Sequence, residues 1–343
     1  MEQRDTQSDV LAFDVGGAAI KAADGEGWSL SERFELWRNS ERLAESLVRV
    51  ARARRPDRIV ATMTGEIADC YPSRAVGVAR IVEAVEAAAA AVGCELGIYL
   101  VDGSIVPPSQ ATQRPLAAAA ANWHALARLA ARHAAADTAL LLDVGSTTTD
   151  IIPIEAGRPA PTATDDAGRM RSGELVYTGV ERTPVAAIVR SLPWRGERRP
   201  VASERYADSR DAWLLLGGLA EDAGDLGTAD GRPATKEHAR GRLARMLLLD
   251  PHDFTLDDAI VAACSCAEAQ ARKVAAGLRR ATFGRPRPEA IVLSGHGLRL
   301  ARRAVELAGF GGRIMSLDES LGPAISRVAP AHAVALVATG AIR

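Results

Sequence analysis

The sequence is poor in lysine, cysteine and aromatic residues. Only three of the 42 lysine and arginine residues are lysines, namely Lys21, Lys236 and Lys273. Because lysine is rare here, each of the three is a candidate for a functional role. The four cysteines form no Cys-X-X-Cys pair. A zinc site or a disulfide framework is therefore not predicted, and the cysteines are expected to be buried thiols in a reducing compartment.

The sequence also lacks an excess of charge of either sign and a long apolar run. A formal net charge of -1 argues against a basic nucleic-acid surface. Of two Ala-rich stretches, 83–92 is too short to cross a bilayer, and 116–136 carries arginine and histidine. The first residues have neither the basic region nor the apolar core of a signal peptide. These absences predict a soluble cytoplasmic protein with no nucleic-acid or membrane partner.

With 343 residues, 48% of them hydrophobic, the chain is long enough for two domains with buried cores. Strand and helix signals alternate along it. Strands are expected at 10–16, 18–23, 28–35, 57–63, 96–103, 138–144, 147–155, 289–297 and 313–317. Helices are expected at 40–54, 75–92, 115–135, 183–191, 202–220, 234–249, 255–281, 298–308 and 331–341. Residues 156–182 and 193–200 are rich in Gly, Pro or Arg and are expected to be loops. This alternation predicts an α/β fold.

One pattern occurs twice. "LAFDVGGAAIKAADG" begins at Leu11, and "LLLDVGSTTTDIIPI" begins at Leu140. Each is an apolar run followed by Asp-Val-Gly, small residues and a charged residue seven places after the Asp. Asp14 and Asp143 open the two copies. The repetition predicts two similar lobes, each of which contributes one small-residue hairpin to a shared cleft.

The composition of both turns suits a phosphate. Gly16 and Gly17 leave the first turn almost without side chains, so backbone N–H groups can approach an anion, and Lys21 adds a charge. In the second turn the same backbone role falls to Gly145. Hydroxyl donors follow it at Ser146 and Thr147.

A metal ion is expected at the same place. Asp14 and Asp143 stand where Mg²⁺ bound to phosphate oxygens needs carboxylates. Asp-Gly pairs are also common in ordinary hairpin turns, and that alternative stays open for either copy taken alone.

A third element, "VLSGHG" at 292–297, supplies Gly295 and Gly297. The three elements together resemble the superfamily of actin, sugar kinases and the heat-shock-protein ATPase domain. The resemblance implies a two-lobed actin-like ATPase (ribonuclease H-like) fold with a cleft between the lobes. The first lobe would comprise 1–137 and 331–343, and the second lobe 138–330. It also places Gly295 and Gly297 at the bound phosphates or nucleotide.

Longer stretches narrow the resemblance. They are "ATMTGEIADCYPSRAVGVARIVEAV" from Ala61, "GELVYTGVERTPVAAIV" from Gly173, and "DAWLLLGGLAEDAGDLGTADGRPATKEHARGRLARML" from Asp211. They are similar to a hydantoinase/oxoprolinase-like family linked to tetrahydromethanopterin-dependent one-carbon metabolism. The characterised activity of that family is an aryl-ether-forming synthase of methanofuran biosynthesis. The first turn departs from the family, which has Asn and Thr more often before the lysine.

The resemblance implies a transferase of alkyl or aryl groups other than methyl. Its substrates would be small molecules: an aminomethylfuran-methanol diphosphate and the phenol of γ-glutamyltyramine or a tyrosine analogue. Diphosphate would leave, and Mg²⁺ with Lys21 would stabilise its charge. A carboxylate is expected to accept the phenolic proton, because a phenol has a pKa of about 10.

Two carboxylates are candidates for that base. Glu66 follows a strand end, and Asp230 stands in "TADGRP"; either one could instead serve only a turn. Arg182 and Lys236 are weaker candidates for the carboxylate of the acceptor. Two aromatic side chains are also notable. His296, between two glycines, is expected at a turn, and Trp123 is expected in the core.

Two other functions remain open on the sequence. An ATP-dependent kinase or ATPase of the same fold would contact adenine around Gly295–Gly297. An actin-like assembly protein would need a long exposed apolar insertion, and the sequence shows none. Homo-oligomerisation and the identity of the phenolic acceptor are not decided by the sequence.

Overall fold

The computed structural model describes residues 9–342, which form two compact units. Unit 1 contains the described residues up to Leu141 together with Pro153–Arg169 and 315–342; unit 2 contains Leu142–Ile152 and Met170–Ile314. The lobes expected from the sequence divide the chain differently, since 138–141, 153–169 and 315–330 group with unit 1. No helix in the described residues is long and apolar enough to cross a membrane.

The first sheet has six strands in the order β3-β2-β1-β4-β5-β6. They are β1 (Val10–Val15), β2 (Ala19–Ala23), β3 (Ser29–Arg33), β4 (Arg58–Met63), β5 (Glu95–Tyr99) and β6 (Ile105–Val106). β1, β4 and β5 are parallel, while β2, β3 and β6 each run antiparallel to the preceding neighbour. β1 and β4 read as continuous apolar runs because they lie in the centre of the sheet.

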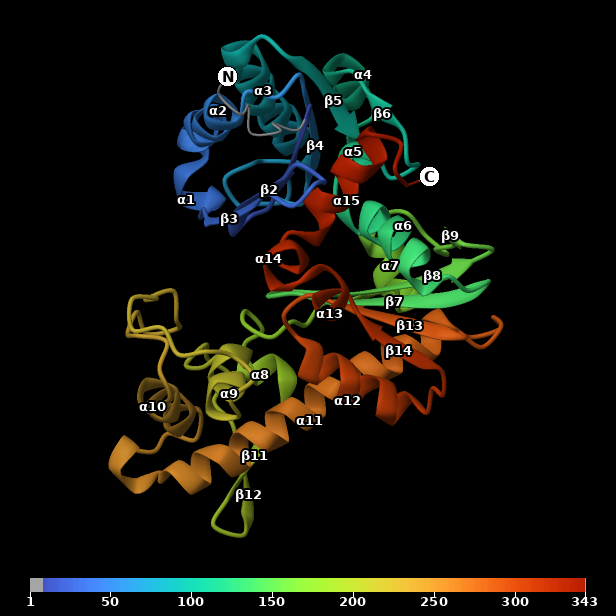
Figure 1. Ribbon diagram of the computed structural model, residues 1–343. Coiled ribbons are helices and arrows are strands. Elements are labelled where there is room, and N and C mark those ends of the chain that lie inside the picture. The colour runs from blue at the N-terminus through green and yellow to red at the C-terminus, as the bar shows by residue number, and fades with distance from the viewer. Residues whose placement is uncertain (1–8, 343) are drawn as a thin grey trace, which may run out of the picture. The chain divides into compact units, whose positions relative to one another are not determined.

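Unit 1 also contains most of the helices of the chain. They are α1 (Leu36–Asn39), η1 (Ser40–Arg42), α2 (Leu43–Arg54), α3 (Arg74–Val92), α4 (Pro108–Gln113), α5 (Pro115–Ala118), α6 (Asn122–Ala134), α7 (Asp166–Ser172), α13 (Leu317–Leu321), α14 (Pro323–Ser326) and α15 (Ala329–Ala338), with α7 ending just inside unit 2. Helix α2 packs on α3, and α15 packs on β1, β2 and β4 (Figure 1).

The second sheet has the order β10-β8-β7-β13-β14, with β9 also paired to β8. Its strands are β7 (Thr138–Val144), β8 (Thr149–Glu155), β9 (Arg158–Pro159), β10 (Leu175–Val176), β13 (Ala290–Ser294) and β14 (Arg313–Ser316). Two mixed sheets with intervening helices make the protein an α/β protein, as predicted.

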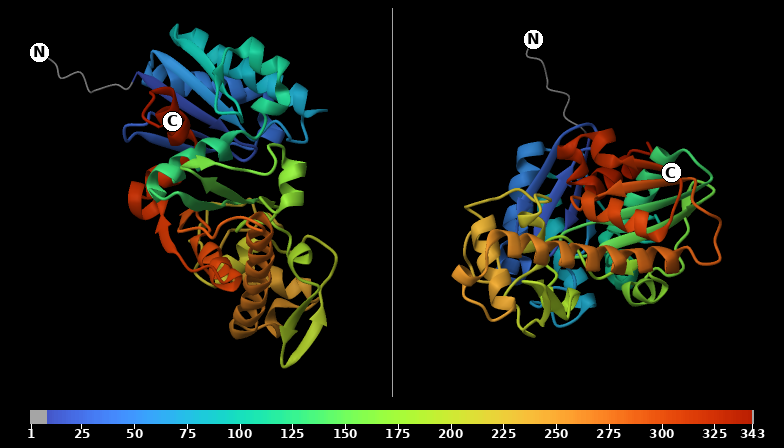
Figure 2. Two further views of the ribbon diagram at one scale, coloured as in Figure 1. Left: turned by 90° about the vertical axis from the view of Figure 1, so that its right-hand side faces the viewer. Right: turned by 90° about the horizontal axis from the view of Figure 1, so that it is seen from below.

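Unit 2 also contains a helical subregion and a short hairpin. The elements are α8 (Val185–Ile188), β11 (Ser191–Trp194), β12 (Glu197–Pro200), α9 (Ser209–Leu215), α10 (Lys236–Met246), η2 (Pro251–Asp253), α11 (Leu256–Ala281) and α12 (Leu298–Ala308). The long helix α11 packs on α9, α12 and β11 (Figure 2). A capping box at Thr255 and Asp258 fixes where α11 begins.

Several predicted elements were wrong in extent. The helix expected at 115–135 is broken into α5 and α6, because Ala120 adopts a positive φ of 47° between them. Residues 193–200 are not a loop but part of the β11–β12 hairpin, whose turn residues Arg195 and Gly196 both have positive φ, as a two-residue turn requires. The loop expected at 156–182 contains β9, α7 and β10.

The helices expected at 183–191 and 202–220 are shorter in the structure, where they correspond to α8 and α9. The flanking residues 202–208 form bends and isolated bridges instead. Ala207 in this stretch is buried in the apolar core of unit 2 without belonging to a helix, which propensity alone does not reveal.

Candidate functional site

The first predicted hairpin forms in unit 1 as a tight turn between β1 and β2. The Gly16 N–H donates to the Ala19 carbonyl at 3.0 Å. Among the described residues, the N–H groups of Gly17 and Ala18 donate to no backbone carbonyl. Lys21 lies directly opposite Asp14 in the strand register. The turn thus has two amides without a backbone acceptor and a cation nearby, the features on which the predicted anion site depends.

Asp14 is almost completely buried, with 3% exposure, at the end of β1. Its Oδ1 has no hydrogen-bond partner. Burial raises the pKa of Asp14, and the charge of Lys21 and a hydrogen bond from Asn122 only partly oppose that rise. A buried carboxylate oxygen without a partner is a group that a cation would satisfy.

The second predicted hairpin has the same geometry in unit 2. The Gly145 N–H donates to the Thr148 carbonyl at 2.9 Å, matching the bond in the first turn. Within the described part of the chain, the N–H groups of Ser146 and Thr147 donate to no backbone carbonyl. The repeated sequence pattern therefore produces the same turn twice, with backbone donors left over in each.

A segment that sequence reasoning did not connect to this turn packs directly on it. The N–H of Val180 donates to the Gly145 carbonyl, and the N–H groups of Glu181 and Arg182 donate to the Ser146 carbonyl, all at 3.0 Å. A Cβ at Gly179 would lie 2.5 Å from the Gly145 oxygen, so only glycine permits this approach. Residues 179–182 thereby fix the position of the hairpin turn.

The glycine turn after β13 completes this part of unit 2. The Gly297 N–H donates to the Val144 carbonyl at 3.1 Å. Gly295 has a φ of +79°, and a Cβ there would lie 2.2 Å from the Val144 oxygen and 2.8 Å from Asp143 Oδ1. The structure thus brings together Gly145, Ser146, Gly295 and Gly297, four residues that the sequence predicted for one site.

A polar cluster lies at the meeting point of these segments. His296 Nε2 is 2.9 Å from Glu181 Oε1 and 3.3 Å from Ser146 Oγ, and Ser146 Oγ donates to Glu181 Oε1 at 3.1 Å. Arg210 forms ion pairs with both Glu181 and Asp225. Burial opposes ionisation of Glu181, but His296 and Arg210 outweigh it and lower its pKa to about 2.

Sequence reasoning missed Glu181. It singled out the next residue, Arg182, for its charge. The only available signal was that Glu181 stands in the same family-like stretch, because no local pattern shows that it meets a histidine more than a hundred positions later. Arg182 touches this cluster through its N–H, which bonds to the Ser146 carbonyl, whereas the Lys236 N–H bonds to Glu221 Oε2 at 2.9 Å at the start of α10.

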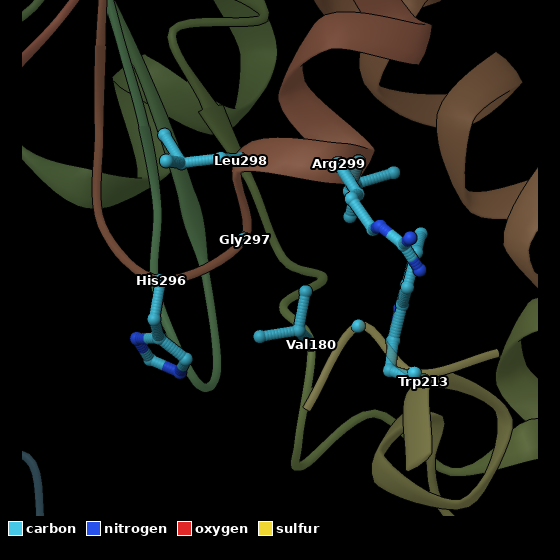
Figure 3. A pocket seen from close by; sticks show the side chains of 9 residues that line it. Val180, Trp213, His296, Gly297, Leu298 and Arg299 are labelled. Atoms are coloured by element: carbon cyan, nitrogen blue, oxygen red, sulfur yellow. The ribbon is translucent and has the colours of Figure 1, made fainter. Parts of the chain in front are cut away.

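A pocket of about 230 Å³ adjoins the cluster (Figure 3). Its lining includes Val180, Trp213, His296, Leu298 and Arg299. The pocket is therefore partly aromatic and apolar. The His296 imidazole lies at its edge, and Arg299 contributes a guanidinium on another side.

The wall of this pocket is fixed by a buried amide. The Trp213 Nε1–H donates to Gln270 Oε1 at 2.9 Å, and Gln270 Nε2 donates to Thr178 Oγ1 and to the Gly179 carbonyl at the same distance. Gln270 has no exposed surface. Gln270 of α11 therefore fixes the position of the Trp213 indole relative to residues 178–179.

Glu66 lies just after β4, as expected, but its side chain is buried away from solvent. Its side chain is 1% exposed, and neither carboxyl oxygen has a hydrogen-bond partner. Burial raises its pKa to about 7; Asp166 adds to the rise, while Arg74 and the nearby amides of Glu66 and Ala120 reduce it without reaching full hydrogen-bond geometry. A substrate does not reach Glu66 in this conformation, which argues against the predicted role as base.

Asp230 is engaged in ion pairs. Its Oδ1 is 3.0 Å from Arg242 Nη1 and its Oδ2 is 3.2 Å from Arg245 Nη1. Burial opposes ionisation, but the Arg232 amide and both guanidinium groups hold its pKa below the ordinary range. A carboxylate so held is a weak base. Its role is to pair the completely buried Arg242, together with Asp211 at 2.8 Å.

The acidic candidates for Mg²⁺ lie in different units, Asp14 in unit 1 and Asp143 in unit 2. In the described residues, the only close group of three metal-ligating side chains is Asp250, His252 and Asp253, all exposed. Neither candidate belongs to a ready-made cage. Mg²⁺ commonly binds through one or two carboxylates, substrate phosphates and water, so the unpartnered Oδ1 of Asp14 fits the requirement.

Trp123 is 2% exposed, which confirms the prediction that it belongs to the core. The Arg169 guanidinium stacks 4.1 Å from the centre of its ring. This stacking covers one face of the indole inside unit 1.

The chain belongs to the hydantoinase/oxoprolinase family, which matches residues 57–312. Within that class, it is 32% identical over 255 residues to the (4-(4-(2-(gamma-L-glutamylamino)ethyl)phenoxymethyl)furan-2-yl)methanamine synthase of Methanocaldococcus jannaschii. The match covers 74% of this chain and 75% of that protein. The family and the relationship to an enzyme predicted from the sequence are thus confirmed.

Two further proteins are similar over part of the sequence or in fold. The synthase of the same name from Methanococcus vannielii is 36% identical over 121 residues, which cover 35% of this chain and 54% of that protein. A ROK family glucokinase from Streptomyces griseus aligns in structure over 95% of this chain and 97% of its own, with 13% identity and a TM-score of 0.49. The α/β fold class rests on the two sheets and their helices described above.

Proposed function

We propose that the protein is a transferase that joins an aminomethylfuran-methanol diphosphate to the phenol of γ-glutamyltyramine or a tyrosine analogue, with release of diphosphate, in the biosynthesis of a methanofuran-type cofactor. The observation that carries this proposal is the 32% identity over 74% of the chain to the M. jannaschii synthase. The name of that enzyme specifies a phenoxymethyl link between a phenol and a furan. Such a link is an aryl ether.

The turns support the proposal because diphosphate is a demanding leaving group. Its developing charge needs donors that are already in place when the C–O bond breaks. In unit 2 the amides of Ser146 and Thr147, which donate to no backbone carbonyl among the described residues, are such donors. In unit 1 the amides of Gly17 and Ala18 and the ammonium of Lys21 have the same character.

Mg²⁺ belongs to the proposal as well. Asp14 would hold it through its unpartnered Oδ1, and Asp143 is the corresponding carboxylate of the second hairpin. When bound, Mg²⁺ would neutralise part of the charge on the diphosphate oxygens. The residues of the chain would still have to orient both substrates and accept the phenolic proton.

A nucleotide-dependent kinase or ATPase is the second candidate. The observation that favours it is the pocket beside Gly297, where a base could be held next to the phosphate turn. The transferase releases diphosphate from the furan diphosphate, whereas the second candidate releases phosphate from ATP.

The test combines purified protein and Mg²⁺ with the furan diphosphate and γ-glutamyltyramine, and a parallel reaction contains ATP alone. The transferase requires that diphosphate release depend on the phenol and that the coupled ether be found by mass. Phosphate release from ATP without a coupled product would establish the second candidate and exclude the first.

Lys21→Ala is expected to weaken the binding of inorganic diphosphate in Mg²⁺ by about tenfold or more, because it removes one charge-assisted hydrogen bond. Titration calorimetry measures this directly. Lys273→Ala, which removes an exposed lysine on α11, is the matched control and should bind as the unaltered protein does. Excess EDTA should weaken binding in all three proteins. Unchanged affinity in Lys21→Ala would remove Lys21 from the site.

A further inference from the structure

The unit 2 pocket combines three features that a phenol acceptor needs. Trp213, Val180 and Leu298 give it an aromatic and apolar lining. His296 stands at its edge with an acid–base group. The volume of about 230 Å³ is below the roughly 300–1,000 Å³ of pockets that bind drug-sized ligands, so it suits one ring with part of its substituent.

The hydrogen bonds of His296 determine what it can do. Nε2 faces both Glu181 and Ser146, so the same nitrogen serves both contacts. A nucleophilic serine would need one ring nitrogen on the hydroxyl and the other on the carboxylate, and this arrangement is different. Because Glu181 is ionised, it fixes the proton of the neutral imidazole on Nε2. Nδ1 is then the nitrogen that can accept a proton.

We propose that this pocket binds the phenol ring of the acceptor and that His296, oriented by Glu181, is the base that takes the phenolic proton. The inference rests on the function proposed above and deepens it by assigning the acceptor subsite and its base. Glu181 acts through His296 and is a positioning residue, and Arg210 in turn holds Glu181.

The proposed step balances without another reactant. The phenolic O–H bond breaks, and its proton moves to His296 Nδ1. The phenolate oxygen forms a bond to the furfuryl carbon as the bond from that carbon to the diphosphate oxygen breaks. The electron pair of the broken bond leaves with diphosphate. Ser146, 3.3 Å from His296, belongs to the turn with free amides, so acceptor and leaving group are close to one another in unit 2.

The alternatives within the described residues are less suited. Glu66 is sealed from solvent, and Asp230 is held by two arginines. The His296 side chain, in contrast, is 41% exposed. Exposure at a pocket edge is what a base that meets a substrate requires.

Charged groups from several elements surround His296. Glu181 pairs with it from the 179–182 segment and Arg210 stands behind Glu181 on α9. Arg299 lines the same pocket from α12, and Asp143 approaches the adjacent Gly295 from β7. Protonation of the imidazole removes its free lone pair, so the rate should fall on the acid side of the pH profile.

The test measures ether formation by His296→Gln, Glu181→Gln and the control His252→Gln. His252 is an exposed histidine of the same unit, outside the pocket lining. His296→Gln should lower kcat by about 100-fold or more, and Glu181→Gln by about tenfold or more. Both should change the acid limb of the pH profile. A further variant, His296→Ala, leaves space for a free imidazole, and added imidazole should partly restore its activity. His252→Gln should match the unaltered protein in all three readouts.

The subsite has its own test. Val180→Leu adds one methylene to the lining and should raise KM for γ-glutamyltyramine by about tenfold, with little change in KM for the furan diphosphate. Circular dichroism confirms that each variant is folded. Full activity of His296→Gln, or an unchanged KM for γ-glutamyltyramine in Val180→Leu, would overturn the inference. Failure of the unaltered protein to form any ether would instead overturn the proposed function.

Discussion

Glu66 is the residue whose environment departs most from what its sequence position suggested. It follows a strand end and was expected at an accessible edge, yet Gly77 of α3 lies directly against its backbone: a Cβ there would be 2.1 Å from the Glu66 oxygen. The helix therefore covers the turn, and the carboxyl is removed from water. A sequence shows the strand end but not which helix covers it.

The burial of Glu66 makes stability depend on pH. In the unfolded chain the group ionises near its ordinary pKa of 4.5, whereas in the folded protein it ionises near 7. As pH rises from 4.5 to 7, only the unfolded chain gains from ionisation, so the folded protein loses stability; above 7 the penalty is constant. Glu66→Gln removes the ionisable group and with it this loss.

The free energy of unfolding of Glu66→Gln, relative to the unaltered protein, should therefore rise by roughly 3 kcal/mol between pH 4.5 and pH 8. Urea unfolding at the two pH values measures it. Glu45→Gln, at an exposed position on α2, should show no comparable change. A difference that is the same at both pH values would mean that Glu66 is ionised and compensated in the folded protein.

At the scale of the element, the second hairpin depends on close backbone packing from two other segments. Gly145, the 179–182 segment and the 295–297 turn meet through main-chain hydrogen bonds. The sequence predicted the first and third of these elements by their glycines. It did not predict that "TGVER" joins them, because a stretch without regular periodicity gives no sign of its partner.

Gly179→Ala should separate these segments. Its Cβ would lie 2.5 Å from the Gly145 oxygen, which is backbone and has little freedom to move. Overpacking of this kind costs about 1–3 kcal/mol. Urea unfolding should show that loss, and calorimetry should show weaker diphosphate binding.

Gly311→Ala provides the control for this prediction. Nothing lies within 4 Å of a Cβ at that position, so its effect should stay within about 0.5 kcal/mol. If Gly179→Ala were as stable as Gly311→Ala and bound diphosphate normally, the 179–182 segment would not be what holds the turn.

At the scale of the whole molecule, each unit has its own apolar core. One core combines the first sheet with α2 and α3, and includes Leu47; the other combines α8 to α11, and includes Leu243. The two cores share no residue. Both leucines are fully buried, with 0% exposure.

Leu243→Ala is expected to cost about 2–5 kcal/mol, chiefly in unit 2, and Leu47→Ala a similar amount, chiefly in unit 1. Native-state hydrogen exchange should show faster exchange in α9–α11 for the first variant and in β1, β4 and α2 for the second. If both variants accelerated exchange equally throughout the described residues, the chain would unfold as one cooperative unit.

The sequence by itself determined the two hairpins that begin with Asp-Val-Gly, the alternating α/β order and the family, because each depends on residues that are neighbours along the chain. Asp-Val-Gly followed by small residues specifies a tight turn wherever it occurs, and apolar periodicity specifies a helix or a strand.

Only the tertiary structure decided the surroundings of those elements. Ser146 and His296 meet although 150 positions separate them. Burial changed Glu66 from an expected surface base to a sealed carboxyl, and two arginines turned Asp230 into an ion-pair partner. Solvent access and charge pairing arise from contacts between distant segments, and for that reason no local pattern encodes them.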